Sequence, residues 1–331
     1  MANPATFDLV GIGNAIVDVL SYADDAFLAK NEMVKGSMRL IDAATADALY
    51  RAAGPAVEAS GGSAANTVTG LAALGGRAGF IGKVSNDQFG GIFRHDIRAA
   101  RVRFDTPAAL SGAPTARCLV FVTPDAQRTM MTYLGACLEL GEADIDEPLV
   151  AAAKVTYLEG YLWDPPQAKL AFLKAAETAH RAGREVALSL SDPFCVERHR
   201  EELVQLVENH VDILFANEAE ICALWQVGDF DSALAATRGK CRIAALTRSE
   251  KGSVVLADRH AHVIEAAPVE RVVDTTGAGD QYAAGFLYGY VTGRSPQSCG
   301  RIGSHAAAEV IGHIGARPQV PLAERVLAQF A

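Results

Sequence analysis

A short stretch of the sequence, DTTGAGDQYAAGF over residues 274–286, joins a Gly-Ala-Gly turn to a carboxylate and a helix of small residues. The N–H groups at the start of a helix have no intrahelical acceptor and lie at the positive end of the helix dipole, so they bind anions. Gly277, Ala278 and Gly279 would supply such groups, yet Asp280 places a negative side chain beside them. The stretch therefore predicts an anion site that contains its own carboxylate.

Polar groups of the kind that hold a sugar occur in two segments of the first 70 residues. Asn14 and Asp18 follow the first predicted strand, and an amide with a nearby carboxylate suits vicinal hydroxyls. A turn asparagine and a helix-capping aspartate would explain the same two residues. In the motif SGGSAAN, Gly61 and Gly62 lack a Cβ and let a ligand approach the backbone, and Asn66 would point into the same cleft. A simple tight turn is the alternative there.

Two later segments carry groups that suit a metal ion and a nucleotide. Asn217 and Glu220 lie three residues apart at a predicted helix start, so their side chains share a face and suit a Mg²⁺ ion held through water. A capping box, with Asn217 as N-cap and Glu220 closing it, explains the same spacing. In LTRSEKGSVV, Thr247 and Arg248 are placed to reach phosphates, although a hairpin turn at Gly252 requires no such role.

The elements that must position these residues alternate between strand and helix. The predicted strands are FDLVGIG, AGFIGKVS, VTYLEG, EVALSLS, VDILFAN, RIAALTRS and SVVLAD, and the predicted helices are SAANTVTGLAALG, AKLAFLKAAETAHRAG, RHREELVQLVENH and EAEICALW. Repeated βα units predict an α/β fold with a mainly parallel sheet and helices on both faces. Ligands of such sheets bind beyond the carboxyl ends of the strands.

Two segments interrupt the alternation, at about residues 18–55 and 104–135. The second alternates apolar and polar residues around Thr123–Pro124–Asp125, which predicts a β-hairpin. We interpret both segments as insertions that converge into a small β-rich lid over the site, within a single domain spanning residues 1–331. Extra strands at the edge of the main sheet are the alternative. Open edges of the lid would favour a homodimer in which two lids pair.

The composition limits the class of protein. Half of the 331 residues are hydrophobic and 21% are charged, which is typical of a soluble globular chain. A net charge of −9 without any basic run argues against nucleic acid and anionic membranes as partners. The first residues lack a signal-peptide pattern, and no run of about 18 apolar residues occurs. The six cysteines are scattered without a CxxC pair, which predicts reduced thiols and a cytoplasmic protein.

The order of the motifs is more specific than any one of them. GxGNxxxD, GGxxAN, NxxE, TxxxxG and DTTGAGDxxxAGF together resemble the ribokinase-like carbohydrate and nucleoside kinase family, from about Phe7 to Pro321. The resemblance implies a three-layer fold with a lid and an ATP-dependent kinase. It implies that Asp280 takes the proton of the acceptor hydroxyl, while the N–H groups of residues 277–279 stabilise the transferred phosphoryl group. The sequence contains no GxxxxGK[ST], which excludes a P-loop kinase.

The resemblance also assigns the ATP and cation sites. It implies that Asn217 and Glu220 serve Mg²⁺ and phosphate, and that Thr247 to Gly252 form an ATP-binding turn, in which Arg248 and Ser249 replace a glycine region of many members. Ser304 and His305 fall where members border the adenine of ATP. A potassium site of backbone oxygens, present in some members, corresponds to Asp274, Thr276, Val310, His313 and Gly315.

The acceptor segments resemble the adenosine kinase branch of the family. GNAIVDVL and LSLSDPF are similar to motifs of that branch, and Leu134, Tyr161 and Leu162 stand where it contacts a purine. These segments imply phosphorylation of the 5′-hydroxyl of adenosine or a related nucleoside, as in purine salvage. Glu159 stands where sugar kinases of the family bind a hydroxyl, which keeps a free sugar (ribose, fructose or a sugar acid) as the alternative. A paired structural glutamate would also explain it. A third reading is a binding protein that has lost catalysis, and the retained GAGD and NxxE motifs argue against it.

Overall fold

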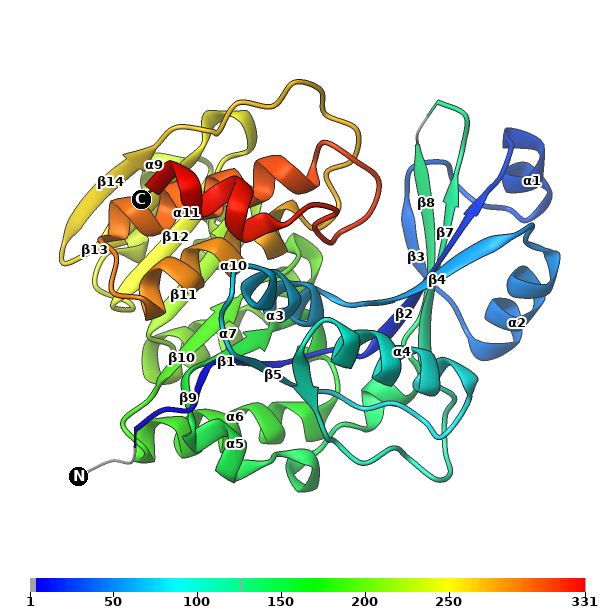
Figure 1. The fold of residues 1–331 in the computed structure, drawn as a ribbon, viewed down its shortest axis with the longest axis horizontal. Helices are drawn as coiled ribbons and strands as arrows, with labels where there is room; N and C mark the ends of the chain where they lie inside the picture. Colours follow the sequence, from blue (N-terminus) through cyan, green and yellow to red (C-terminus); the bar gives the residue numbers. More distant parts are fainter. Residues whose placement is uncertain (1–3, 126, 331) are drawn as a thin grey trace.

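The computed structural model describes residues 4–125 and 127–330, and its larger part is built on a nine-stranded sheet (Figure 1). The order of its strands is β14 (His260–Ile264), β13 (Ser253–Ala257), β12 (Ile243–Thr247), β11 (Ile213–Asn217), β10 (Glu185–Ser189), β9 (Ala153–Glu159), β1 (Phe7–Ile12), β5 (Ala78–Ile81) and β6 (Val102–Phe104). The seven strands from β12 across the sheet to β6 pair in parallel. The remaining two pairs, β12–β13 and β13–β14, are antiparallel. The predicted α/β class is confirmed.

Helices cover both faces of this sheet and form three layers with it. One face carries α3 (Ser63–Ala73), α4 (Gln88–Ala99), α10 (Ala278–Val291) and α11 (Pro296–Val310), and the other carries α5 (Glu147–Ala151), α6 (Pro166–Arg181), α7 (Pro193–His210), α8 (Glu218–Trp225) and α9 (Phe230–Thr237). Side chains of the central strands alternate between two hydrophobic cores: Leu9 belongs to the first and Val10 to the second. This continuous apolar pattern is what a sheet buried on both faces requires.

Short segments of 3-10 and π helix lie between these elements and at the C-terminal end of the described chain. They are η1 (Gly135–Glu139), η2 (Glu142–Asp144), η3 (Gly160–Trp163), η4 (Ser249–Lys251), η5 (Ala323–Leu327) and η6 (Ala328–Phe330). No helix in the described ranges is both long and apolar enough to cross a membrane.

The position of a ligand site follows from the strand order. Strand β1 lies between β9 and β5. From β5 the strand order continues to β6 on one side of β1, and from β9 it continues to β10 on the other side. A crevice opens where the order reverses in this way, at the carboxyl ends of the strands. The residues that follow β1 and β9, from Gly13 and from Gly160 onwards, therefore border the expected site.

A second, smaller sheet stands beside the first and forms the lid (Figure 1). Its strand order is β3 (Met38–Leu40), β8 (Arg128–Tyr133), β7 (Ala116–Val122), β2 (Ile16–Tyr22) and β4 (Ala56–Gly61). Strands β7 and β8 form the antiparallel hairpin predicted around Thr123–Pro124–Asp125. Helices α1 (Asp25–Lys30) and α2 (Ala43–Ala52) cover one face, where Phe27 contacts Phe121 with ring centroids 5.1 Å apart.

The two edges of the lid, β3 and β4, carry exposed apolar side chains. Met38, Leu40 and Val57 are 49%, 51% and 69% exposed. Edge strands of this kind offer unpaired backbone groups to another strand. Pairing of two lids in a homodimer stays a prediction.

Candidate active site

The GAGD turn opens α10 as the sequence predicts. Gly277 is the N-cap with φ of 78°, a left-handed conformation that favours glycine, and a Cβ there would lie 2.6 Å from Ala316 Cα. Ala278 and Gly279 follow in the first turn, and Ala278 N–H donates to Thr275 O at 3.2 Å. The turn therefore presents the positive end of a 14-residue helix to the crevice.

Asp280 lies in that first turn and is held by two side chains from α3. Ser63 Oγ donates to Asp280 Oδ1 at 2.6 Å, and Asn66 Nδ2 donates to Asp280 Oδ2 at 3.0 Å. Burial raises the pKa of Asp280, while the two hydrogen bonds and the charge of Arg317 act in the opposite direction. A carboxylate with a raised pKa and a fixed orientation is a suitable proton acceptor. The contact with Asn66 brings together two residues that were predicted separately.

Asp18 is a strand residue and not a helix cap. It lies in β2, and a Cβ at Gly61 of the neighbouring β4 would collide with its carboxylate, so this glycine lets the chain pass close to Asp18. Burial raises the pKa of Asp18 to about 6, Arg317 and Arg128 lower it, and Asp280 raises it further. Asp18 thus faces the same crevice as Asp280.

Asn14 and Glu159 form a buried pair beneath the crevice. Asn14 Nδ2 donates to Glu159 Oε1 at 2.7 Å, and Ala64 N–H donates to Glu159 Oε2 at 2.7 Å. Their exposures are 2% and 1%. Burial raises the pKa of Glu159 to about 7 against these hydrogen bonds. Both carboxylate oxygens of Glu159 therefore accept hydrogen bonds from the protein itself. Glu159 is a paired structural glutamate, and its side-chain partner is an amide instead of a lysine. Gly62, at the N-cap of α3, has φ of 95° and passes close to Asn14 O.

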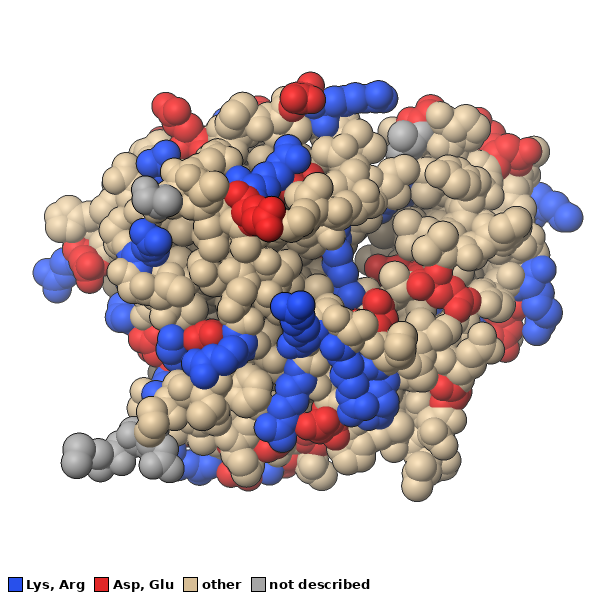
Figure 2. All heavy atoms as spheres, in the orientation of Figure 1, with Lys and Arg blue, Asp and Glu red and all other residues tan. Residues whose placement is uncertain are grey.

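A residue that the sequence did not single out reaches this loop from the lid. Arg128, at the start of β8, lies 2.8 Å from Asp274 Oδ2 as an ion pair, and its Nη1 donates to Thr276 Oγ1 at 3.2 Å. The side chains of Arg128 and Asp274 are 11% and 5% exposed. The Arg128 guanidinium of the lid therefore contacts the DTTGAGD loop. Figure 2 shows a hollow between the main body and the lid, with basic and acidic atoms on its rim.

Asn217 and Glu220 form a complete capping box at the start of α8. Glu220 N–H donates to Asn217 Oδ1 at 2.9 Å, and Glu220 Oε2 and Oε1 accept from the backbone N–H and Nδ2 of Asn217 at 2.9 and 2.6 Å. The capping box, which was the alternative explanation of this spacing, is thus present. Burial, followed by the charges of Asp192 and Asp280, raises the pKa of Glu220 to about 7.

The donor set fits a hydrated Mg²⁺ ion. No group of three or more His, Cys, Asp or Glu in the described ranges is arranged to hold a metal ion. Mg²⁺ needs no such cage, because it keeps several waters and takes one or two carboxylates together with substrate phosphates. Glu220, with Asn217 beside it, would hold such an ion through water.

The residues expected to bind ATP lie at the end of β12, in the turn that follows it and on α11. Thr247 ends β12, and Gly252 follows η4 with φ of 79°. The Arg248 guanidinium is paired with Glu218, with Nε 3.1 Å from Glu218 Oε2. On α11, Ser304 Oγ accepts from Ala267 N–H at 2.8 Å, which fixes the loop that follows β14. His305 stacks edge-on against Phe330 at 5.5 Å.

The positions expected for potassium come from two loops in contact. Asp274 Oδ1 accepts from Thr276 N–H at 3.0 Å, and Asp274 Oδ2 accepts from Gly315 N–H at 2.9 Å. Val310 is the last residue of α11, and His313 Nε2 lies 3.2 Å from Glu309 Oε1. The loops are adjacent, and the potassium site stays a prediction.

The expected purine contacts are placed differently from one another. Tyr161 in η3 is 38% exposed, whereas Leu162 is only 1% exposed and belongs to the core under α6 and α7, so Leu162 has no surface for a ligand. A single turn of η3 sends the two side chains in different directions. Leu134 follows β8 and is partly buried against the core that includes the lid.

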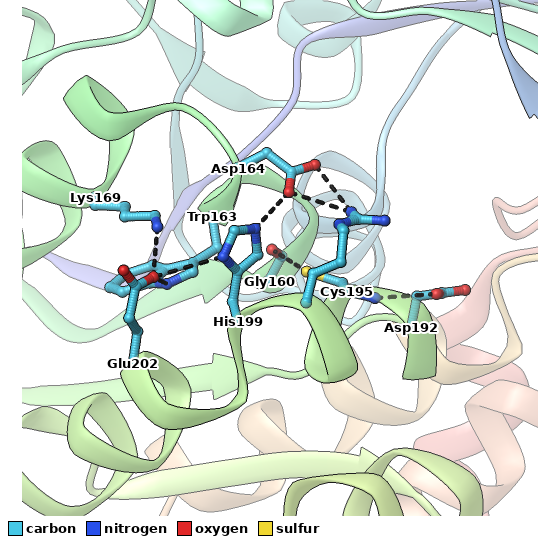
Figure 3. Close-up of polar contacts among 9 residues, drawn as sticks. Gly160, Trp163, Asp164, Lys169, Asp192, Cys195, His199 and Glu202 are labelled. Carbon is cyan, nitrogen blue, oxygen red and sulfur yellow. Dashed lines mark hydrogen bonds and ion pairs between the residues drawn. The ribbon is translucent and has the colours of Figure 1, made fainter.

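Helix α7 fixes the η3 segment that carries Tyr161 (Figure 3). Cys195 Sγ donates to Gly160 O at 3.1 Å, and Trp163 Nε1 donates to Glu202 Oε2 at 3.0 Å. Asp164 Oδ1 lies 2.6 Å from His199 Nε2, at the point where α7 departs from helical geometry. These ties hold Tyr161 at the carboxyl end of β9, beside the crevice.

Known proteins are similar to this chain in sequence and fold. Residues 36–323 match the family described as pfkB family carbohydrate kinase. The chain belongs to the pfkB family. It is therefore an ATP-dependent kinase with a ribokinase-like fold, as the motifs predict. The family assignment rests on the match to most of the chain.

The similar proteins include both nucleoside and sugar kinases. The structure of an adenosine kinase from Sinorhizobium meliloti aligns with a TM-score of 0.91 at 54% identity, covering 99% of this chain and 100% of that one. A probable sugar kinase from Rhizobium etli aligns with a TM-score of 0.91 at 51% identity, covering 98% and 99%. A probable chloroplastic fructokinase-6 from Arabidopsis thaliana is 31% identical over 265 residues, which are 76% of this chain and 68% of that protein.

Proposed function

We propose that this kinase transfers the γ-phosphoryl group of ATP to the 5′-hydroxyl of adenosine or a closely related nucleoside. The observation that carries this proposal is the surface that the lid turns towards Asp280. The similarity to an adenosine kinase from Sinorhizobium meliloti supports it. A free sugar is the alternative acceptor, since a probable sugar kinase is almost as similar.

Strand register defines the site-facing surface of the lid. Residues directly opposite one another in paired strands share a face, and so do residues two apart along a strand. Asp18 is opposite Cys118, which is opposite Thr132. Two residues further along β2, the next row is entirely apolar. Its members are Val57, Leu20, Val120, Met130 and Met38.

An apolar row next to a hydroxyl-binding carboxylate matches the shape of a nucleoside. Asp18 and Asn66 suit the ribose hydroxyls, and the row beyond Asp18 would cover the flat face of a base. A free pentose has no group that reaches this row, so its apolar surface would stay in water. Covering it with a purine stabilises binding by about 25 cal/mol for each Å² of apolar surface removed from water.

The residues of the crevice divide the chemistry between them. Asp280 accepts the proton of the acceptor hydroxyl, and the N–H groups of residues 277–279 hold the negative charge that develops on the phosphoryl oxygens. Arg128 adds a positive charge to the same loop from the lid. When bound, Mg²⁺ neutralises the phosphates of ATP. Retention of Asp280 with its two hydrogen bonds argues against a protein that only binds its ligand.

Glu220→Gln is expected to raise the Mg²⁺ concentration required for half-maximal activity. The substitution removes a carboxylate that fits the hydrated ion, while the amide oxygen still accepts one hydrogen bond of the capping box. Asp229→Asn, which neutralises the exposed N-cap of the next helix, serves as the control. Activity is titrated with Mg²⁺ at fixed ATP, and Tm is measured in parallel. Overlapping Mg²⁺ titrations with an altered Tm would mean that Glu220 acts only as a cap.

Met130→Ala and Leu134→Ala are each expected to lower kcat/KM for adenosine by about tenfold, equivalent to about 1.4 kcal/mol. Both substitutions remove apolar surface that would cover the base, and ribose does not use it. Val34→Ala, an exposed apolar change on the lid at 72% exposure, serves as the control. The measurement is kcat/KM for adenosine, ribose and fructose. The nucleoside assignment fails if the wild-type protein prefers ribose or fructose and both variants behave like it.

A further inference from the structure

Three successive residues of the segment after α11 contact the catalytic loop and its surroundings. Gly315 N–H donates to Asp274 Oδ2 at 2.9 Å, and Ala316 O accepts from Gln281 Nε2 at 3.0 Å. Ala316 also packs so closely on Gly277 that a side chain there would collide with it. The third residue, Arg317, extends further into the crevice.

Arg317 contacts the acceptor side of the site through a fixed guanidinium group. Its Nε donates to Asn66 Oδ1 at 3.1 Å, and its Nη1 donates to Ser60 Oγ at 2.5 Å. Asp96 of α4 holds the same group, since Arg317 Nη1 lies 3.2 Å from Asp96 Oδ2, which also accepts from Ser60 N–H at 2.7 Å. The Arg317 side chain is 19% exposed. Elements from three parts of the chain thus meet at one arginine.

We propose that Arg317 is a positioning residue that sets the orientation of the Asn66 amide and thereby of the Asp280 carboxylate. The inference rests on the proposed role of Asp280 as the proton acceptor. An asparagine side chain has one accepting end and one donating end, whereas a guanidinium only donates. With Arg317 on Asn66 Oδ1, only Nδ2 is left to face Asp280, and it donates to Oδ2. If the amide turned over, its oxygen would face a carboxylate oxygen.

The same arginine brings positive charge to the carboxylates around Asp280, while Arg128 from the lid pairs with Asp274 of the neighbouring loop and lowers the pKa of Asp18. The ionisable groups whose charges interact with Asp280 come from several elements. They are Asp18 on β2, Tyr157 and Glu159 on β9, Tyr161 in η3, Glu220 on α8 and Arg317 itself. Arg317 is the cation of this set, and its charge lowers the pKa of Asp280 against the effect of burial. Loss of that charge therefore moves the protonation of Asp280 to higher pH.

Three substitutions separate the two effects of Arg317. Arg317→Ala removes both and is expected to lower kcat at pH 7 by about tenfold to a hundredfold, the scale of a displaced catalytic group. Arg317→Gln keeps an N–H donor for Asn66 but not the charge, so the acid limb of the pH–kcat profile is expected to move to higher pH. Arg317→Lys keeps the charge, and its acid limb is expected to stay near that of the wild-type protein. Arg325→Ala removes an exposed arginine of the same C-terminal segment and serves as the control.

Two measurements test the proposal. The pH profile of kcat is recorded with whichever of adenosine, ribose or fructose the wild-type protein turns over best. Carboxyl ¹³C NMR of labelled aspartate, with Asp280→Asn for assignment, follows the titration of Asp280 with no acceptor present. If Arg317→Gln and Arg317→Ala change Tm alone, with profiles and titrations that overlay the wild type, the proposal is wrong. A preference for a free sugar would overturn the nucleoside assignment, while the NMR titration would still decide the role of Arg317.

Discussion

Asp280→Asn is expected to lower kcat by about two to four orders of magnitude, the usual scale for loss of a general base. The amide cannot take the proton of the acceptor hydroxyl. Its oxygen still accepts from Ser63, but its nitrogen faces the donating Nδ2 of Asn66. We therefore expect a loss in kcat with ATP and acceptor affinities close to those of the wild-type protein.

The control for this prediction keeps the carboxylate and removes one of its partners. Ser63→Ala deletes the 2.6 Å hydrogen bond to Oδ1, which is worth about 1.5–3 kcal/mol for a charged acceptor. Its kcat is expected to fall much less than that of Asp280→Asn. Single-turnover kinetics give the chemical step, and calorimetry gives the affinity for adenosine. Near-normal turnover by Asp280→Asn would contradict its assignment as the proton acceptor.

Local chemistry explains which parts of the site were predictable from the sequence. The left-handed Gly277 and the Asn217–Glu220 capping box depend only on neighbours within a few residues. A short sequence motif is therefore enough to predict them. Seven of the nine strands of the main sheet were equally visible, because burial on both faces leaves a continuous apolar run, whereas the edge strands β6 and β14 were not predicted. The order of the motifs along the chain then indicated the family and its fold.

The residues that were missed or misplaced depend on contacts distant in the sequence. Arg128 and Arg317 lie in loops or at a strand start with no motif, and their partners are 146 and 251 residues away, at Asp274 and Asn66. For Glu159 the sequence left a hydroxyl-binding role and a structural pairing open, and it could not name the partners Asn14 and Ala64 that occupy its oxygens. Leu162 reads as a purine contact, but the turn of η3 directs it into the core. No pattern in one sequence encodes which way such a side chain turns.

Arg128→Ala is expected to lower kcat by about two to three orders of magnitude, the loss seen when one group that stabilises developing charge is removed. The guanidinium contacts the loop that opens α10, and in the proposed mechanism the phosphoryl oxygens gain charge there during transfer. The lid supplies it, so transfer would depend on the lid being in place. Arg39→Ala, an exposed arginine of the adjacent strand β3, is the control and is expected to leave kcat unchanged.

A double substitution separates this role from simple neutralisation of Asp274. Removing Arg128 alone leaves a carboxylate of 5% exposure without its cation, which destabilises the fold by about 3–5 kcal/mol. Asp274→Asn removes that charge while its side-chain oxygen can still accept one of the N–H groups that Asp274 holds, those of Thr276 and Gly315. If Arg128 only neutralises Asp274, the double variant Arg128→Ala/Asp274→Asn has the same kcat as the single variant Asp274→Asn. If Arg128 stabilises the phosphoryl group, the pair regains Tm but not kcat, because no other lid cation pairs with this loop among the described residues.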